Sequence, residues 1–326
     1  MNSVASGTKP RLWLTRKLSA NTEERARRDY DVVLNPQDTL SNADDIIRMS
    51  AEVDAIIPCH SEIFDADTVS QLDGRLKIVA NHSVGVDHCD LDALQKKGIC
   101  VTNTPDVLSD ATAEIAMLLL LGAARRAAEG DAMVRGGDWD SWSPSFMVGT
   151  QMTGKRLGIL GMGRVGQVLA RRARGFDMDV HYFNRTRLEP ALEDGAQFHD
   201  SLDSLLAVSD FLSLHCPATE KTKGIIDSKA IDKLPQGAII VNTARGALVD
   251  EAALIAAIRA GKLAAAGLDC FAHEPGGNPA FAEFSNIMML PHIGSATSET
   301  RDAMGFRALD NLDAFFANKQ PVDRLV

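Results

Sequence analysis

Three polar residues, Arg245, Glu274 and His292, each come just after an apolar run that favours a buried strand. The three runs span residues 239–243, 268–271 and 287–291. Because the carboxyl ends of parallel strands meet at one edge of a sheet, where ligands bind, we expect a guanidinium, a carboxylate and an imidazole to share one site. Such a set suits the reduction of a 2-keto acid, in which charge grows on the carbonyl oxygen and a proton must reach it.

Each of these side chains has its own predicted role in that chemistry. His292 is the candidate proton donor, because an imidazole titrates close to neutral pH. Glu274 is expected to hold the other ring nitrogen, which fixes the tautomer and favours the charged ring. Arg245 is expected to clamp the substrate carboxylate and to polarise the carbonyl oxygen. Taken singly, the same residues are equally typical of a surface ion pair, a turn and a satisfied loop.

A glycine-rich turn upstream of these residues predicts a dinucleotide site. The apolar run 157–160 leads into Gly161-x-Gly163-x-x-Gly166, which opens an amphipathic helix. Gly161 permits a tight turn, Gly163 lets a pyrophosphate approach the backbone, and Gly166 lets the helix pack against the strand. Arg164 and Val165, at the positive end of that helix, belong to the predicted cofactor site.

The end of the next strand indicates which dinucleotide the chain prefers. Residues 180–183 form that strand, and Asn184, Arg185, Thr186 and Arg187 follow it. Folds that prefer NAD usually carry Asp or Glu at this tip, whereas two guanidinium groups suit the 2′-phosphate of NADP. The sequence therefore predicts NADPH as cofactor, with NADH binding more weakly. The alternative is that both arginines are solvated loop residues.

Strand and helix patterns alternate along almost the whole chain, which predicts an α/β fold with two doubly wound parallel sheets. Early strands are expected at 11–15, 55–58, 77–81 and 99–102, and six more from residue 157 onward. Long helices are expected from residue 108 or 109 to about 129 and from about 298 to 318.

The late position of the glycine motif indicates that another domain precedes the cofactor domain. We expect a flavodoxin-like substrate-binding domain of residues 1–104 plus 294–326, and a Rossmann-type cofactor domain of residues 105–293. Two crossings between the domains would form a hinge with an interdomain cleft.

Composition excludes several classes of protein. The 326 residues, 45% of them hydrophobic and 24% charged, are those of an ordinary soluble two-domain protein. A net charge of −10 argues against nucleic acid as a partner. Residues 1–16 lack the apolar core of a signal peptide, and the apolar run 115–124 is too short to cross a bilayer. We therefore expect no membrane partner.

The cysteines and the clustered histidines predict neither a disulfide framework nor a metal site. The five cysteines are odd in number and form no Cys-x-x-Cys pair, which favours reduced thiols in the cytoplasm. The crowded run His82, Asp87, His88, Cys89 and Asp90 fits no zinc template, so no metal is expected.

Five ordered segments make the chain similar to the D-isomer-specific 2-hydroxyacid dehydrogenase family over nearly its whole length. They are Asn81-His-Ser-Val-Gly-Val-Asp, Gly161-Met-Gly-Arg-Val-Gly, Val241-Asn-Thr-Ala-Arg-Gly, Gly267-Leu-Asp-Cys-Phe-Ala-His-Glu-Pro and Leu290-Pro-His-Ile-Gly-Ser. The resemblance implies that Arg245, Glu274 and His292 form the catalytic trio. It also implies that Asp269 holds the nicotinamide carboxamide.

The resemblance also implies contacts outside the trio. The substrate carboxylate would bind the backbone amides of Val84 and Gly85, beside Ser83, across the cleft from Arg245 and His292; glycine at 85 permits close approach to the backbone. Further implied cofactor contacts are His215, Cys216, Pro217, Thr222, Thr243, Ala244 and Gly294.

Within the family, Trp139-Asp-Ser-Trp142-Ser-Pro144 is similar to an arm of the glyoxylate and hydroxypyruvate reductases. In those enzymes the arm crosses to a partner subunit, and its second tryptophan can line the partner's active site. The resemblance therefore implies a homodimer. Trp142 either enters the substrate site of the partner subunit or fills the dimer contact together with Trp139.

The expected activity is NADPH-dependent reduction of glyoxylate or hydroxypyruvate to glycolate or D-glycerate, with His292 as general acid. One alternative is another D-2-hydroxyacid dehydrogenase of the family, such as one acting on 2-keto-gluconate. Formate oxidation is disfavoured by Glu274, because that reaction involves no proton acceptor. The alternative from a different class is a non-catalytic scaffold that senses a dinucleotide.

Overall fold

The structure is a computed structural model that describes residues 9–326, and these form two compact units. One unit contains the chain up to Leu108 together with Ala296–Val326, and the other is Ser109–Ser295. Every pairing between named strands in the described residues is parallel. The predicted α/β fold with two parallel sheets is confirmed.

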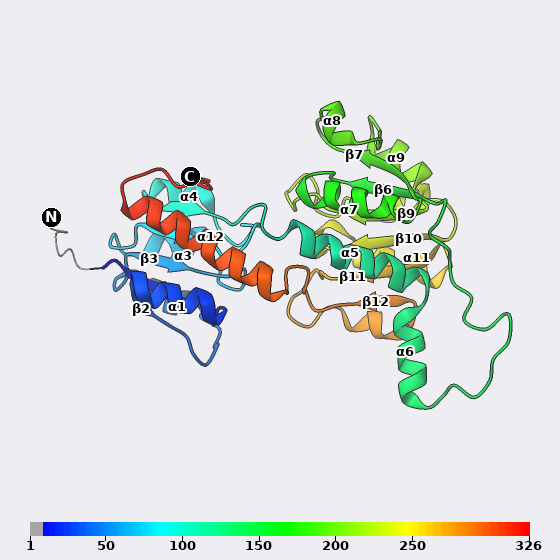
Figure 1. Cartoon of the computed structure of the whole chain (residues 1–326), viewed down its shortest axis with the longest axis horizontal. Coiled ribbons are helices and arrows are strands. Elements are labelled where there is room, and N and C mark those ends of the chain that lie inside the picture. Colours follow the sequence, from blue (N-terminus) through cyan, green and yellow to red (C-terminus); the bar gives the residue numbers. More distant parts are fainter. Residues whose placement is uncertain (1–8) are drawn as a thin grey trace. The chain divides into compact units, whose positions relative to one another are not determined.

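The first unit has a five-stranded sheet in the order β2-β1-β3-β4-β5, which is the flavodoxin-like order (Figure 1). Its strands are β1 (Arg11–Leu14), β2 (Asp31–Val33), β3 (Ala55–Ile57), β4 (Ile78–Ala80) and β5 (Cys100–Thr102). Its helices are α1 (Ala20–Asp29), α2 (Ala43–Ser50), α3 (Ala66–Gln71), α4 (Leu91–Lys96) and α12 (Ser298–Phe316). The sequence did not indicate β2, because this edge strand begins with the exposed Asp31 and its two valines are only partly buried, so it lacks the apolar run of the inner strands.

Helices cover both faces of this sheet, so neighbouring residues of one strand enter different cores. Leu12 and Leu14 pack with residues of α1 and α12, whereas Trp13, between them, packs with residues of α2 and α3. A strand buried on both faces reads as a continuous apolar run, which is why the sequence predicts it well.

The second unit has a seven-stranded sheet in the order β12-β11-β10-β9-β6-β7-β8. Its strands are β6 (Arg156–Leu160), β7 (Asp179–Phe183), β8 (Gln197–Phe198), β9 (Phe211–Leu214), β10 (Ala238–Asn242), β11 (Leu263–Leu268) and β12 (Ile287–Met289). The direction of strand order reverses between β6 and β9, as in a dinucleotide-binding fold. The expectation of six strands was wrong by one, because β8 is only two residues long.

Helices pack on both faces of the second sheet. One face is covered by α5 (Ser109–Ala124) and α7 (Arg164–Arg174), and the other by short helices that follow the remaining strands (Figure 1). These are α9 (Leu202–Val208), α10 (Ser228–Lys233), α11 (Glu251–Arg259) and the 3-10 turns η1 (Gly246–Leu248) and η2 (Pro279–Glu283). The short helix α8 (Pro190–Glu193) follows β7, and its Glu193 accepts from the hydroxyl of Tyr182. Within β10, Ile239 and Ile240 belong to opposite cores.

The expected continuous helix to residue 129 is wrong. The first helix, α5, ends at Ala124, and a separate helix, α6 (Ala127–Gly136), follows it. Arg126 has a φ of 56°, in the left-handed region. A residue in this conformation cannot continue a right-handed helix, so the helix ends before it. No helix in residues 9–326 combines the length and the apolar character that crossing a membrane requires.

Candidate active site

The predicted catalytic residues follow three adjacent strands of the second sheet. Arg245 comes after β10, Glu274 after β11 and His292 after β12. Since these strands are parallel neighbours, their carboxyl ends lie at the same edge of the sheet.

The side chains of Glu274 and His292 are joined by a hydrogen bond. His292 Nδ1 lies 2.6 Å from Glu274 Oε2, and the side chains are 29% and 24% exposed. A carboxylate only accepts hydrogen bonds, so Nδ1–H of His292 is the donor. His292 has a φ of 52°, a conformation that a non-glycine residue adopts only when its surroundings hold it there. The pair therefore fixes the orientation of the ring and the proton on Nδ1.

Asp269 holds the backbone that follows His292. The carboxylate is fully buried, and its two oxygens accept hydrogen bonds from the N–H groups of Ile293 and Gly294, each at 2.8 Å. Burial raises the pKa of Asp269, and the two backbone donors partly oppose this. A Cβ added at Gly294 would stand 3.1 Å from Asp269 Oδ2, so glycine permits this close approach. Asp269 thus positions the turn that carries His292, the predicted proton donor; the contact of Asp269 with the carboxamide stays a prediction.

The turn that carries Arg245 is held by Asn242. Its side-chain nitrogen donates to the carbonyl of Arg245 at 2.8 Å, and its oxygen accepts from the N–H of Ala244 at 3.0 Å. Gly246 then passes so close to the chain after β11 that an added Cβ would lie 1.8 Å from the carbonyl carbon of Phe271. Sequence reasoning did not select Asn242 as a functional residue, although it stands inside the Val241-Asn-Thr-Ala-Arg-Gly segment.

The loop with Glu274 has a similar support, which the sequence did not reveal. Glu251, in the first turn of α11, accepts from the N–H of Ala272 at 2.8 Å and from the amide of Asn278 at 3.0 Å. Glu274 itself accepts from the N–H of Phe271 at 2.8 Å through its other oxygen. The two contacts of Glu251 join residues that are 21 and 27 positions apart in the chain, and no motif connects them, so only the folded chain shows them.

The glycine motif fits a dinucleotide pyrophosphate. Gly161 has a φ of 94°, and a Cβ there would lie 2.6 Å from the N of Cys216. At Gly163, by contrast, an added Cβ would meet nothing within 4 Å, and this residue caps α7 without a side-chain hydrogen bond. The motif therefore leaves open space at the positive end of a helix, beside Arg164 and Val165, where an anion binds favourably. A Cβ at Gly166 would be 2.8 Å from the Gly161 carbonyl oxygen, which explains the third glycine.

The tip of β7 changes the prediction about the two arginines. Arg187 is bound by both carboxylate oxygens of Glu193, at 2.7 and 3.0 Å, and lies over the ring of Phe198. It is therefore part of the local structure. Arg185 is exposed and makes no ion pair with a described residue, and Thr186 is exposed beside it. Asn184 accepts from the N–H of Met162 at 2.7 Å, so it ties this tip to the glycine turn.

The segment after β9 is desolvated. His215 Nε2 lies 2.8 Å from Ser213 Oγ, and burial lowers the pKa of His215 to about 4. Burial raises the pKa of the Cys216 thiol to about 11, so the thiol stays protonated at neutral pH. Pro217 accepts through its carbonyl from the hydroxyl of Thr222 at 2.7 Å, which closes a local turn. None of these groups is ionised at neutral pH.

One orphaned polar atom supports the fit of the cofactor. Thr243 Oγ1 is buried and has no hydrogen-bond partner among the described residues. Thr243 and Ala244 come directly after β10 at the same edge as the glycine turn. A buried hydroxyl without a partner is costly, so a bound ligand is the natural partner for it.

The loop after β4 in the first unit also presents donors. Ser83 donates from its hydroxyl to the Gly85 carbonyl at 2.8 Å, and Asn103 donates to the Val84 carbonyl at 2.8 Å. The N–H groups of Val84 and Gly85 make no hydrogen bond with another described residue. The loop therefore holds its carbonyls and leaves two adjacent amides for a ligand.

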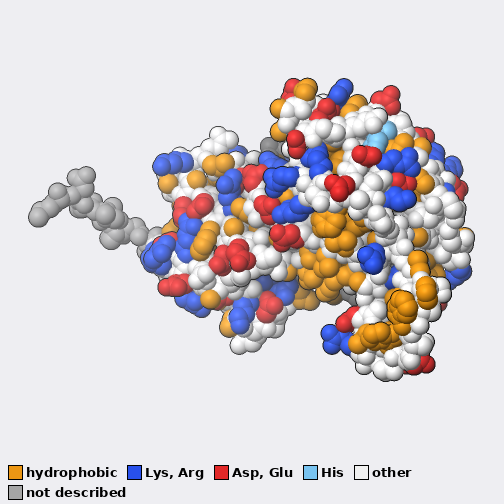
Figure 2. Space-filling model, turned by 45° about the vertical axis from the view of Figure 1, so that its right-hand side comes forward, with side chains coloured by type: hydrophobic (Ala, Val, Ile, Leu, Met, Phe, Trp, Pro, Cys, Tyr) orange, Lys and Arg blue, Asp and Glu red, His pale blue; other side chains and the backbone are white. Residues whose placement is uncertain are grey.

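The arm that carries Trp142 stands away from the core of the second unit. None of the residues of α6 is buried, and the chain that follows it leads in a long excursion back to β6 (Figure 1). Trp142 is 73% exposed and Trp139 57%. Hydrophobic side chains also gather on this part of the surface (Figure 2).

The chain matches a family model described as "D-isomer specific 2-hydroxyacid dehydrogenase, NAD binding domain" over residues 117–294. It is 44% identical to a glycerate dehydrogenase from Hyphomicrobium methylovorum over 95% of this chain and 97% of that protein. It is 41% identical to a glyoxylate reductase from Thermococcus litoralis over 96% of both chains.

A solved structure is also similar over the whole length. An NADPH-dependent glyoxylate/hydroxypyruvate reductase from Sinorhizobium meliloti, in complex with NADP and malonate, has a TM-score of 0.86 and 30% identity. The similarity covers 98% of this chain and 97% of that one.

Proposed function

Because this chain belongs to the D-isomer specific 2-hydroxyacid dehydrogenase family and is an NAD(P)-dependent enzyme of that family, we propose that it reduces glyoxylate and hydroxypyruvate with NADPH. The observation that carries this proposal is the 2.6 Å contact between His292 and Glu274 beside the end of β12. Two of the proteins that are similar over almost the whole chain are named glyoxylate reductase and glyoxylate/hydroxypyruvate reductase, and a third is named glycerate dehydrogenase.

The residues of the edge divide the reaction between them. NADPH, when bound, supplies the hydride that reaches the keto carbon. His292 releases the proton from Nε2 to the carbonyl oxygen, while its Nδ1–H stays on Glu274. Arg245 binds the carboxylate and stabilises the charge that develops on the oxygen. The 2-keto acid, one hydride and one proton together give the 2-hydroxy acid.

The cofactor is held by the glycine turn, the tip of β7 and the ends of β9 and β10. Gly161, Gly163 and Gly166 would bind the pyrophosphate, and Arg185 with Thr186 would bind the 2′-phosphate. Arg187 contributes nothing to that phosphate in this proposal, because Glu193 already binds its guanidinium. Removing one charge-assisted contact costs about 1.5–3 kcal/mol, or roughly 10- to 100-fold in affinity.

The variant Arg185→Ala tests the cofactor assignment. We expect the Kd of NADPH to rise about 10-fold and the Kd of NADH to stay unchanged, as measured by fluorescence titration of the two cofactors. Arg187→Ala, two residues along the chain, is the matched control. It should change the Kd of both cofactors alike, because it removes the contact with Glu193. An equal loss for both cofactors in Arg185→Ala would show that this guanidinium does not bind the 2′-phosphate.

Steady-state kinetics with both cofactors test the substrate assignment. The panel is glyoxylate, hydroxypyruvate, pyruvate and 2-keto-gluconate, followed by the loss of reduced cofactor. We expect the highest kcat/KM with NADPH and one of the first two substrates. Turnover of 2-keto-gluconate alone would favour the alternative member of the family.

We also propose that the chain forms a homodimer through α6 and the arm. The support is the exposure of Trp139 and Trp142 together with Val134 and Val148, which are 60% and 65% exposed. A contiguous apolar surface of this kind marks an interaction site. Sedimentation of the purified protein measures the mass directly, and a monomer at micromolar concentration would contradict this proposal.

A further inference from the structure

Arg301, in the second turn of α12, is a partly buried arginine whose guanidinium makes no hydrogen bond or ion pair with a described residue. Burial lowers the pKa of Arg301, and no carboxylate offsets this. The contrast is Arg16 in the same unit, whose guanidinium donates hydrogen bonds to the Asp38 carboxylate, which raises the pKa of Arg16. A partly buried guanidinium without a counter-ion among the described residues is a natural donor to a polar group from outside the chain.

The groups close to Arg301 are either neutral or already hydrogen-bonded to other residues. Burial raises the pKa of the Cys59 thiol to about 12, and burial lowers the pKa of His82 to about 4, so both are neutral at pH 7. The nearby buried carboxylate of Glu62 already accepts from Thr15 Oγ1, from the N–H of Cys59 and from Ser61 Oγ at 2.5, 2.9 and 2.7 Å.

The backbone of Arg301 is tied to the substrate loop of the first unit. His82 Nε2 donates to the Arg301 carbonyl at 3.3 Å, and His82 directly precedes the loop Ser83–Gly85 with its two unused amides. The other ring nitrogen of His82, Nδ1, is buried and has no partner in the described part of the chain. The N-terminal end of α12 and the end of β4 therefore form one polar patch.

The carboxylate that all 2-keto acids share is already assigned in the proposed function. It binds Arg245 there, and the family resemblance separately implies the backbone amides of Val84 and Gly85 as carboxylate contacts. The carboxylate that these substrates share therefore does not need the guanidinium of Arg301 as a partner. Arginine donates well to carboxylate and hydroxyl oxygens, and a site built around a polar group rejects analogues that lack it, because the site then stays unpaired.

We propose that Arg301 is a specificity-determining residue that binds a hydroxyl or carboxylate on the third carbon of the substrate. This inference rests on the proposed function. It predicts a preference for hydroxypyruvate over glyoxylate, which has no third carbon, and tolerance of a 2-keto diacid such as oxaloacetate.

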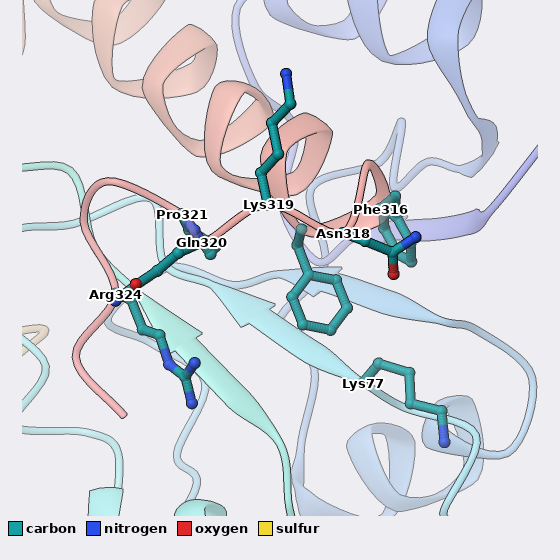
Figure 3. Close-up of a pocket in the computed structure, with 8 residues that line it drawn as sticks. Lys77, Phe316, Asn318, Lys319, Gln320, Pro321 and Arg324 are labelled. Atoms are coloured by element: carbon teal, nitrogen blue, oxygen red, sulfur yellow. The ribbon is translucent and has the colours of Figure 1, made fainter.

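A second cationic region in the same unit does not compete with this site. A pocket of about 470 Å³ is lined by Lys77, Phe315, Phe316, Asn318, Lys319, Gln320, Pro321 and Arg324. Lys319 points away from Lys77 and Arg324, so the three charges do not converge (Figure 3). The pocket lies at the C-terminal end of α12, about 22 Å along the helix from Arg301 at 1.5 Å per residue. Lys319 therefore offers a matched control.

The test is the KM of the full-length enzyme for hydroxypyruvate, glyoxylate and oxaloacetate in Arg301→Met, which keeps an unbranched stem without the guanidinium. We expect the KM for hydroxypyruvate to rise about 10- to 100-fold and the KM for glyoxylate to change less than about 3-fold. Lys319→Met should leave all three values at the wild-type level. A larger effect on oxaloacetate than on hydroxypyruvate would identify the carboxylate as the favoured group.

The outcomes separate this inference from the proposed function. Equal rises for hydroxypyruvate and glyoxylate would assign Arg301 to the shared carboxylate and overturn the inference alone, as would no change for either. No turnover of any 2-keto acid by the wild type would overturn the proposed function and this inference with it. If Arg301→Met does not fold, Arg301→Lys decides: the ratio of the two KM values should rise about 3-fold, because lysine lacks the planar fork.

Discussion

Two histidines stand at the same edge of the second sheet and have opposite character. His215 follows β9 and contacts the neutral hydroxyl of Ser213, and burial lowers its pKa to about 4. His292 follows β12 and donates to the carboxylate of Glu274. The residue type and the position after a strand are the same in both cases. The partner of the ring differs.

The difference teaches that the strand end provides the place and the neighbours decide the chemistry. A histidine that stays neutral over the physiological range cannot supply a proton, so His215 suits the lining of a cofactor site. A histidine that is fixed by a carboxylate and remains partly exposed can exchange a proton with a bound substrate. Substitutions at the two positions should therefore fail in different ways.

The largest effect is expected for His292→Ala. General acid catalysis contributes about 100- to 10,000-fold, so kcat should fall within that range while the Kd of NADPH changes little. Single-turnover oxidation of NADPH and a fluorescence titration of NADPH measure the two quantities separately.

His215→Asn is the comparison variant for that experiment. It should act on cofactor affinity and change kcat by less than about 10-fold, since its ring is not the proton donor. If His215→Asn lost as much of kcat as His292→Ala, the distinction between the two histidines would be wrong.

A smaller effect is expected for Glu274→Gln. Glutamine keeps the shape and can still accept from Nδ1–H, but it removes the negative charge beside the ring. We expect kcat to fall about 10- to 100-fold, because the ring that donates the proton loses its negatively charged partner while the hydrogen bond remains. Steady-state kinetics measure kcat, and an unchanged kcat would assign Glu274 to structure alone.

The sequence predicted the parts of this edge that depend on local chain. Arg245, Glu274 and His292 each follow an apolar run, and the three glycines stand in a fixed spacing, so both groups could be found by reading along the chain. The residues that hold these side chains in place could not be found in this way. Asn242 is a buried polar residue within a motif, and Glu251 acts across a distance of more than twenty residues in the chain.

The same limit explains the wrong predictions. Nothing near Arg187 in sequence reveals that Glu193 folds back to bind it, so both arginines at the β7 tip looked equally free. Nothing in the run 109–129 reveals that Arg126 adopts a left-handed conformation, because its side chain is an ordinary helix former. Such features arise from contacts between segments, and a pattern of residue types does not encode them directly.

The smallest effect concerns stability and sharpens the comparison from the side of His215. Its pKa is about 4 in the folded chain and about 6.5 when unfolded, so the unfolded chain binds the proton more readily. The contribution of His215 to the free energy of unfolding should therefore be fully present above about pH 6.5 and be lost as the pH drops toward 4. Linkage gives a loss of about 1 kcal/mol between pH 7 and pH 5.5 from this one group.

Urea unfolding of the wild type and of His215→Asn at both pH values measures this loss. The variant should lose about 1 kcal/mol less than the wild type, with His82, whose pKa is lowered in the same direction, contributing equally to both proteins. Equal losses in the two proteins would mean that His215 is already accessible to protons in the folded state, and the burial that separates it from His292 would not hold in solution.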